Sequence, residues 1–400
     1  MNNFVKSSVL SLGFFIASRS YAHSFDDFIL PPEGLHAELS VSGAYRSDAL
    51  IEGNQRWVVP GTLMGGEAYP SEAGFGLDEL FLTPVYRKEN TYVMLKIGRH
   101  LGSEDLELEH VLLGYRLNNY LALEGGKMAA IFTPYNGEHP SDTCFSSRRL
   151  VYDALWGGQF NDTGLRLKSN IGGLDSGLEL WKGSRFPAKE KDTEKSAYDV
   201  YTRYSVEDEN HSLSVGAYYF RADANARDDS RYSATHSHAP AAVTVDPTYF
   251  DGKVETKGLM GSLSTKFRGD WSAGFLGEIT QIQQNGRLRD ATHQADFENQ
   301  TMGLWGELFA AVQREKFSFR AERLKVKSDV YGAAAGVLAD KLKLQAMGED
   351  PYRNTLSYEH EFDATFRARV EWAKDFTTLV KRDIYTVSGV WTETVFGIGH

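Results

Sequence analysis

The chain has 400 residues, of which 42% are hydrophobic and 24% charged, and its formal net charge is −11. The excess of carboxylates argues against a nucleic-acid partner, which selects a basic surface. Cys144 is the only cysteine, so an intramolecular disulfide is excluded and stability has to come from burial and strand pairing. No apolar run approaches the roughly 20 residues that a membrane-spanning helix needs.

The first 22 residues have the pattern of a cleaved secretory signal peptide. Lys6 supplies the positive start, residues 9–17 the apolar stretch, and Ser20, Tyr21 and Ala22 a small-x-small cleavage site. Without this segment the formal charge falls from −11 to −13, because two basic residues are lost. We expect a short periplasmic segment over residues 23–34 and a single β-domain over residues 35–400.

Sixteen segments with alternating apolar and polar residues follow, and each predicts a β-strand. Their ranges are 35–45, 75–86, 91–98, 106–115, 119–131, 154–168, 176–183, 198–206, 211–221, 255–267, 270–283, 300–311, 316–327, 352–361, 364–375 and 384–398. The links after odd-numbered segments are 7 to 33 residues long, whereas those after even-numbered segments have 2 to 7 residues. This order predicts an all-β, transmembrane, antiparallel up-and-down β-barrel with short periplasmic turns and long extracellular loops.

The alternation is clearest near the C-terminus. In the run from Phe366 to Trp372, apolar residues occupy one face and Arg367, Arg369 and Glu371 the other. Backbone groups in hydrocarbon have no water to bind, so a spanning sheet has to close on itself, with apolar side chains outside and polar ones inside. A soluble β-sandwich or lectin-like barrel also alternates, but it gives no reason for long and short links to alternate.

The alternation changes phase in the segment 316–327. Phe317 and Phe319 lie on the apolar face, but after Glu322 the apolar residues Leu324 and Val326 fall on the opposite face. Either a β-bulge restores the phase, or the later residues have already left the membrane.

Two stretches carry a family resemblance: LALEGGKMAAIFTPYNGEH, from Leu121, and WGGQFNDTGLRL, from Trp156. With the strand count and loop order, they make the chain resemble Gram-negative outer-membrane porins and, more loosely, the phosphate-selective porin family. The resemblance implies a sixteen-stranded barrel in the outer membrane, a lipid bilayer as surroundings and a homotrimer. The chain departs from that family in its acidic charge, and also in its end at His400 in place of a terminal aromatic residue.

In general porins the third long loop narrows the channel, so the resemblance makes residues 132–153 a candidate constriction. An ordinary solvated loop is the alternative. Inward-facing charges of the predicted strands could line the pore or pair across strands. The candidate pore-lining residues are Arg148, Arg149, Arg166, Lys168, Arg203, Arg320, Glu322, Arg367, Arg369 and Glu371. The loop candidates also include Glu138, His139 and Asp142.

The link from Ala222 to Val254 contains His236 and His238 among several aspartates. Imidazole and carboxylate groups are zinc ligands, but this pattern also arises by chance in polar loops. No cofactor is implied, and no catalytic motif is found. The sequence therefore predicts a porin-like channel for passive diffusion of small hydrophilic solutes or ions. A zinc-binding surface protein and an outer-membrane hydrolase are the alternatives.

Overall fold

A computed structural model describes residues 30–51, 57–100, 106–189, 197–232, 247–345 and 348–398. The predicted signal peptide and residues 23–29 lie outside this part of the chain. Among the described residues, none of the helices has the length and apolar character needed to cross a membrane.

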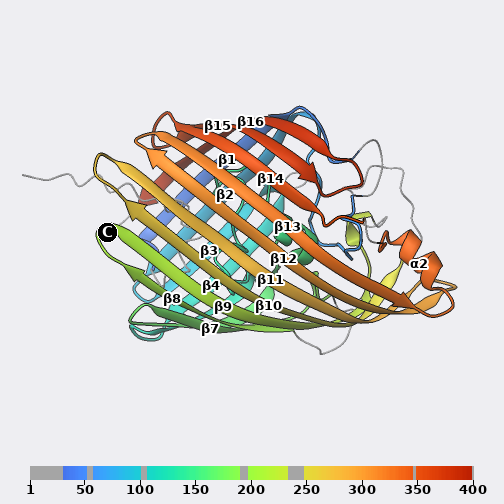
Figure 1. Cartoon of the computed structure of the whole chain (residues 1–400). Helices are drawn as coiled ribbons and strands as arrows, with labels where there is room; N and C mark the ends of the chain where they lie inside the picture. Colours follow the sequence, from blue (N-terminus) through green and yellow to red (C-terminus); the bar gives the residue numbers. More distant parts are fainter. Residues whose placement is uncertain are drawn as a thin grey trace, which may run out of the picture.

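The strands close into one antiparallel barrel in which each pairs with its neighbours in sequence and β1 pairs with β16 (Figure 1). Their bounds are β1 Gly34–Arg46, β2 Gly74–Lys88, β3 Thr91–His100, β4 Glu107–Arg116, β5 Leu121–Ala129, β6 Asn161–Ile171, β7 Leu174–Trp181, β8 Ala197–Glu207, β9 His211–Arg227, β10 Tyr249–Lys266, β11 Trp271–Arg289, β12 Gln294–Val312, β13 Glu315–Tyr331, β14 Tyr352–Glu361, β15 Phe366–Phe376 and β16 Arg382–Ile398. The helices are α1 Leu150–Trp156 and α2 Ala335–Lys341, with a 3-10 turn at Ser230–Tyr232. The predicted sixteen-stranded up-and-down barrel is therefore confirmed.

The side chains of the barrel are arranged inside out relative to a soluble domain. On β15, Val370 is 56% exposed on the outer face, whereas Glu371 beside it is 4% exposed on the inner face. Apolar side chains cover the outer face of the other strands as well. Such an apolar exterior needs a hydrocarbon environment.

Strands β10 to β13 are longer than the sequence pattern predicts, with 17 to 19 residues each. About 9 to 11 residues suffice to cross a bilayer, so these strands project beyond it as a wall at the long-loop end (Figure 1). The predicted link 222–254 is correspondingly too long, because β9 continues to Arg227 and β10 begins at Tyr249. Outside the apolar band the outward residues turn polar, so the hydrophobic pattern stops before the strand does.

Of the two explanations for the phase change in the segment 316–327, the β-bulge is not observed. The pairing of β12 with β13 runs unbroken from Asp296 opposite Tyr331 to Val312 opposite Glu315. Leu324 therefore points inward, where it is 0% exposed. The outward positions of Arg323 and Lys325 belong to the projecting wall, which supports the second sequence interpretation.

The loops at this end of the barrel turn inward over its mouth. Helix α2 packs against β12 and β13, and Leu338 on α2 is fully buried. The backbone N–H of Gly61 donates to the carbonyl of Lys343 at 2.8 Å, and Ser328 donates to the carbonyl of Gly61 at 2.5 Å. Segments far apart in sequence thus pack together over the mouth.

Candidate functional site

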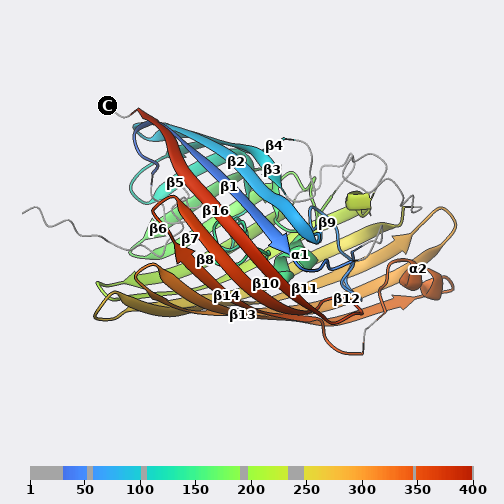
Figure 2. The ribbon, with the colours of Figure 1, turned by 90° about the horizontal axis from the view of Figure 1, so that it is seen from above.

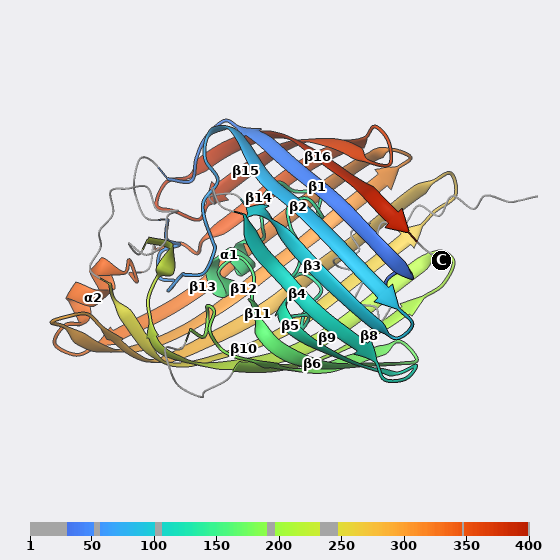
Figure 3. The same cartoon turned by 180° about the vertical axis from the view of Figure 1, so that it is seen from behind.

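The link between β5 and β6, residues 130–160, lies inside the barrel, and we refer to it as loop 3 (Figures 2 and 3). Its two ends meet: the N–H of Ala130 donates to the carbonyl of Phe160 at 3.0 Å. The side-chain amide of Asn136 donates to the carbonyls of both residues at 2.9 Å. Loop 3 therefore leaves the barrel wall and returns to it at the same place, so the pairing of β5 with β6 stays intact.

The segment predicted as a strand over 154–168 is wrong at its start. Residues 154–156 belong to α1, and β6 begins only at Asn161. Gly157 ends the helix in the left-handed conformation, with φ 66° and ψ 36°, which glycine adopts without a steric penalty.

Aromatic side chains fasten one side of loop 3 to the wall. Trp156 on α1 lies 4.7 Å from Phe132 and 5.0 Å from Phe220 of β9, measured between ring centroids. All three rings are fully buried. Burial of such side chains contributes about 1.5 to 3 kcal/mol each to the stability of the fold. The three packed rings fill that side of the lumen.

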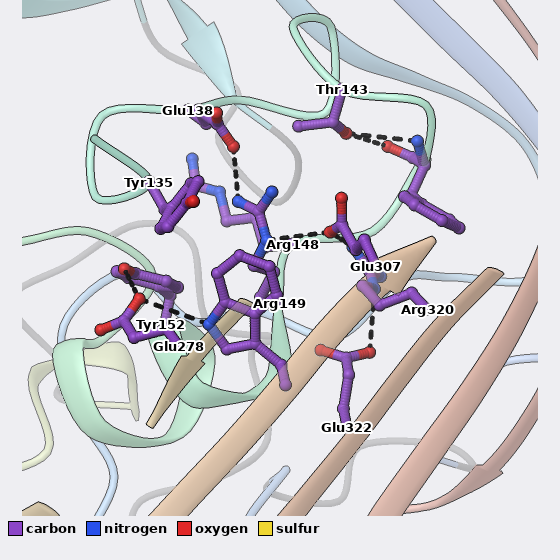
Figure 4. Close-up of polar contacts among 12 residues, drawn as sticks. Tyr135, Glu138, Thr143, Arg148, Arg149, Tyr152, Glu278, Glu307, Arg320 and Glu322 are labelled. Carbon is purple, nitrogen blue, oxygen red and sulfur yellow. Dashed lines mark hydrogen bonds and ion pairs between the residues drawn. The ribbon is translucent and has the colours of Figure 1, made fainter. Parts of the chain in front are cut away.

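Arg149 and Tyr152 fasten loop 3 to β11 and β12 (Figure 4). The Arg149 guanidinium donates to Glu307 at 2.9 Å and to Glu138 at 2.5 Å. Tyr152 donates to Glu278 at 2.6 Å. The Arg149 guanidinium also lies 4.2 Å from the ring centre of Trp305, a cation–π distance.

Glu322 on β13 is the centre of a second anchor. Its carboxylate accepts from Arg320 at 3.1 Å, from Arg353 of β14 at 2.7 Å and from the backbone N–H of Leu150 at 2.5 Å. Arg353 in turn donates to the carbonyl of Arg148 at 2.5 Å. The anchor thus joins two strands to the start of α1.

Strand β15 binds the middle of loop 3 through three charged residues. Arg367 donates to the carbonyl of Ser141, and Arg369 donates to that of Pro140 at 3.0 Å. Glu371 accepts from the N–H of Ser146 at 2.9 Å. Loop 3 therefore crosses the lumen from the β9–β13 side to β15.

His139 fastens loop 3 to the wall between β2 and β4. Its Nδ1 lies 3.0 Å from Glu79 Oε1, and its Nε2 lies 2.9 Å from Glu109 Oε1. Both ring nitrogens can donate to carboxylates only in the doubly protonated imidazolium. Burial and the nearby Lys96 ammonium oppose protonation, but the two carboxylates outweigh them and raise the pKa of His139 above its ordinary value.

The same region contains a metal-ligand arrangement. Ligand atoms of Glu79, His100 and His139 lie within 4.8 Å of one another, and Glu67 and Glu107 form a similar group with His100. The ring nitrogens of His139 are already engaged by carboxylates, however, and Lys96 Nζ lies 3.3 Å from Glu109. These positive charges disfavour a cation at the group that includes Glu79 and His139, which we interpret as a latch for loop 3.

Rising pH should loosen this latch. Because the pKa of His139 is raised in the folded protein, its contribution to stability is fully present below the ordinary histidine pKa of about 6.5. The contribution is lost as pH rises through the raised pKa of the folded state. We therefore expect the current through the reconstituted protein to become noisier in alkaline buffer. His139→Gln should be noisy at every pH, whereas the exposed His211→Gln should behave as wild type. A pH-independent noise level in the wild type would contradict the latch.

Nine of the ten predicted pore-lining residues fall into two groups. Arg149, Arg320, Glu322, Arg367, Arg369 and Glu371 all bind loop 3 or belong to it. The others on the wall pair across strands: Arg166 Nη1 and Lys168 Nζ each lie 2.7 Å from Glu124, and Arg203 Nη2 lies 2.7 Å from Asp175. Arg148 faces a cavity described below. His236 and His238 lie outside the described residues.

Several anchors were missed from the sequence, among them Glu278, Glu307 and Arg353. Arg353 alternates with Thr355 and Ser357 along β14, and all three are buried on the inner face. The period-two pattern marks such residues as inward-facing, but their partners depend on the path of loop 3.

A cavity of about 720 Å³ lies between loop 3 and the segments over the mouth. Asp78 and Glu79 of β2, Arg148 and Asp153 of loop 3, and Arg353 of β14 contribute charges to it. The lining also includes aromatic rings from Trp57, Tyr69 and Phe186. Its volume suits a small organic solute.

No protein-family model matches the chain, and no curated protein matches it in sequence. Among solved structures it is similar to a loop-deletion form of OmpT, an outer membrane protein of Vibrio cholerae, with a TM-score of 0.51 and 12% identity over 90% of this chain and 98% of the other. The trimer form of OmpT, folded in vitro, has a TM-score of 0.51 and 10% identity over 91% of this chain and 100% of the other.

The chain has the fold of an outer-membrane β-barrel. A further similar structure is an anion-selective porin from Comamonas acidovorans, with a TM-score of 0.49 and 11% identity over 90% of this chain and 99% of that one. At these identities the likeness concerns the fold, and the resemblance to the phosphate-selective porin family stays a prediction.

Proposed function

We propose that the protein is a porin-like channel in the outer membrane of a Gram-negative cell. In this role, small hydrophilic solutes or ions diffuse passively through the barrel past loop 3. The observation that carries the proposal is loop 3 itself, which is anchored across a lumen whose inner face is charged. A sixteen-stranded barrel is wide enough for an aqueous channel, and an inward loop with fixed charges narrows it and filters solutes by size and charge.

Export through the signal peptide over residues 1–22 and assembly as a homotrimer belong to the same proposal. The trimer form of the V. cholerae protein supports the second of these. The zinc-binding alternative depended on His236 and His238, and no observation on the described residues favours it or the hydrolase.

Planar-bilayer recording tests the channel directly. The refolded protein in a salt gradient should give stepwise currents of small amplitude, because loop 3 narrows the lumen, and the reversal potential gives the sign of the ion preference. A correctly folded barrel, shown by its heat-dependent mobility in electrophoresis, that gives no current steps would contradict the proposal.

A further inference from the structure

Most charges that line the cavity are neutralised by a partner. Arg46 donates to both carboxylate oxygens of Asp78 at 2.8 Å. Glu79 binds His139, and Arg353 binds Glu322. Lys189 and Asp228, both in the lining, pair with each other. Lys127 in the lining has no ion pair with any residue that the structure describes, but its ammonium donates to the carbonyl of Leu108 at 2.6 Å. These contacts leave little charge for a solute to bind.

Arg148 and Asp153 are different. Among the described residues, neither forms an ion pair within 4.0 Å. Arg148 makes one polar side-chain contact, from Nη2 to His100 Nδ1 at 3.4 Å. Asp153 is 7% exposed, and its carboxylate accepts no hydrogen bond within the part of the chain that the structure describes. Asp153 lines the cavity, and a carboxylate in so enclosed a place is costly in free energy unless water or a ligand binds it.

The surroundings of Asp153 indicate what could bind there. Three guanidinium groups act on its carboxylate, those of Arg353, Arg148 and Arg320, against the single carboxylate of Glu322. Arg353 and Arg320 are both engaged by Glu322, which leaves Arg148 to bind a ligand. A simple cation would be attracted by Asp153 but repelled by the arginines. A simple anion would be attracted by the arginines but repelled by Asp153. A solute with both charges matches the pair.

We propose that the cavity is a binding subsite for a small zwitterionic solute, in which Asp153 accepts from the ammonium group and Arg148 donates to the carboxylate. This inference rests on the proposed channel function and names its solute class. Charge-assisted hydrogen bonds to the two ends supply the affinity. The rings of Tyr69 and Phe186 in the lining offer apolar contacts to the rest of the solute.

The subsite should depend on pH. Burial raises the pKa of the Asp153 carboxyl to about 6, although Arg353 and Arg148 act in the opposite direction. Above this value the carboxylate is charged and binds an ammonium group. As pH falls through it, the negative charge is lost while Arg148 stays cationic, so preference should move from zwitterions to anions.

Four solutes of similar size and different charge test the proposal: alanine, lactate, alaninamide and lactamide. Each is added to the full-length protein in a planar bilayer at neutral pH, and the concentration that halves the ionic current is measured. Alanine should act at the lowest concentration. Asp153→Asn and Arg148→Gln should each raise its half-blocking concentration about tenfold, the loss of one charge-assisted hydrogen bond. Glu298→Gln, which removes an exposed charge from the outer face of β12, should leave it unchanged.

The remaining outcomes separate the subsite from the channel. If the wild type conducts but the four solutes block it equally, the proposed subsite is wrong, and Asp153 and Arg148 interact with each other through water. The proposed channel function would not be affected by this result. If folded wild-type protein conducts no current, the channel itself fails. Alanine affinity that survives both substitutions while current steps stay normal also overturns the inference.

Discussion

Glu322→Ala should be the most damaging single substitution in the barrel, with a loss of about 3 to 5 kcal/mol in the free energy of unfolding. The Glu322 side chain is 0% exposed, and those of Arg320 and Arg353 are 1% and 5% exposed. Its removal leaves two buried guanidinium groups without their main acceptor and frees the N–H of Leu150. Loop 3 should then move in the lumen, so single-channel conductance should become larger and noisier. Denaturant unfolding and bilayer recording measure the two effects.

Two matched variants make the result specific. Glu322→Gln keeps oxygen acceptors but loses the charge, so its effect should lie between wild type and Glu322→Ala. Glu298→Gln removes an exposed carboxylate from the neighbouring strand β12 and should change neither stability nor conductance. Wild-type conductance in a folded Glu322→Ala protein would show that this anchor does not hold loop 3 in place.

The barrel could be predicted because its determinants are local. A strand that crosses a bilayer alternates apolar and polar residues with period two, and Val370 and Glu371 on β15 show that the structure follows this pattern. The order of short and long links then specifies an up-and-down barrel without further information. Pattern reasoning failed where lipid no longer acts on the strand. The outward positions there carry exposed charged residues, such as Arg287 on β11 and Asp296 and Glu298 on β12, so β11 and β12 continue without an apolar outer face.

The interior of the barrel could be predicted only in part. Alternation identified Arg320, Glu322 and Arg369 as inward-facing, but the partner of Glu371 is the N–H of Ser146, which lies 225 residues away in sequence. Helix α1 gave no helical signal either, since all seven of its residues are buried and a helix buried on every side has no amphipathic period. Its last residues, next to the strand β6, therefore looked like the start of that strand.

Excision of loop 3 should have the largest effect on conductance. Ala129 and Asn161 already pair across β5 and β6, and Ala130 is hydrogen-bonded to Phe160, so a short glycine-serine linker can replace residues 131–159 without moving either strand. The barrel should still close, because none of its strand pairs includes a residue of the excised segment. We expect a several-fold rise in single-channel conductance and passage of larger neutral solutes, measured by current steps and liposome swelling.

The excised protein also provides an upper limit against which the effect of the Glu322 anchor can be compared. Wild type, Glu322→Ala and the excised protein should show increasing conductance, because the substitution frees one attachment of loop 3 and the excision removes them all. As a control, replacement of residues 333–350 by the same linker removes α2 from the mouth but leaves the aromatic, Glu322 and His139 contacts of loop 3 in place. If this control raised conductance as much as the excision, the mouth and not loop 3 would limit the current. If the excised barrel folded and conducted like wild type, solutes would pass beside loop 3, and the charges that anchor it would lie outside their path.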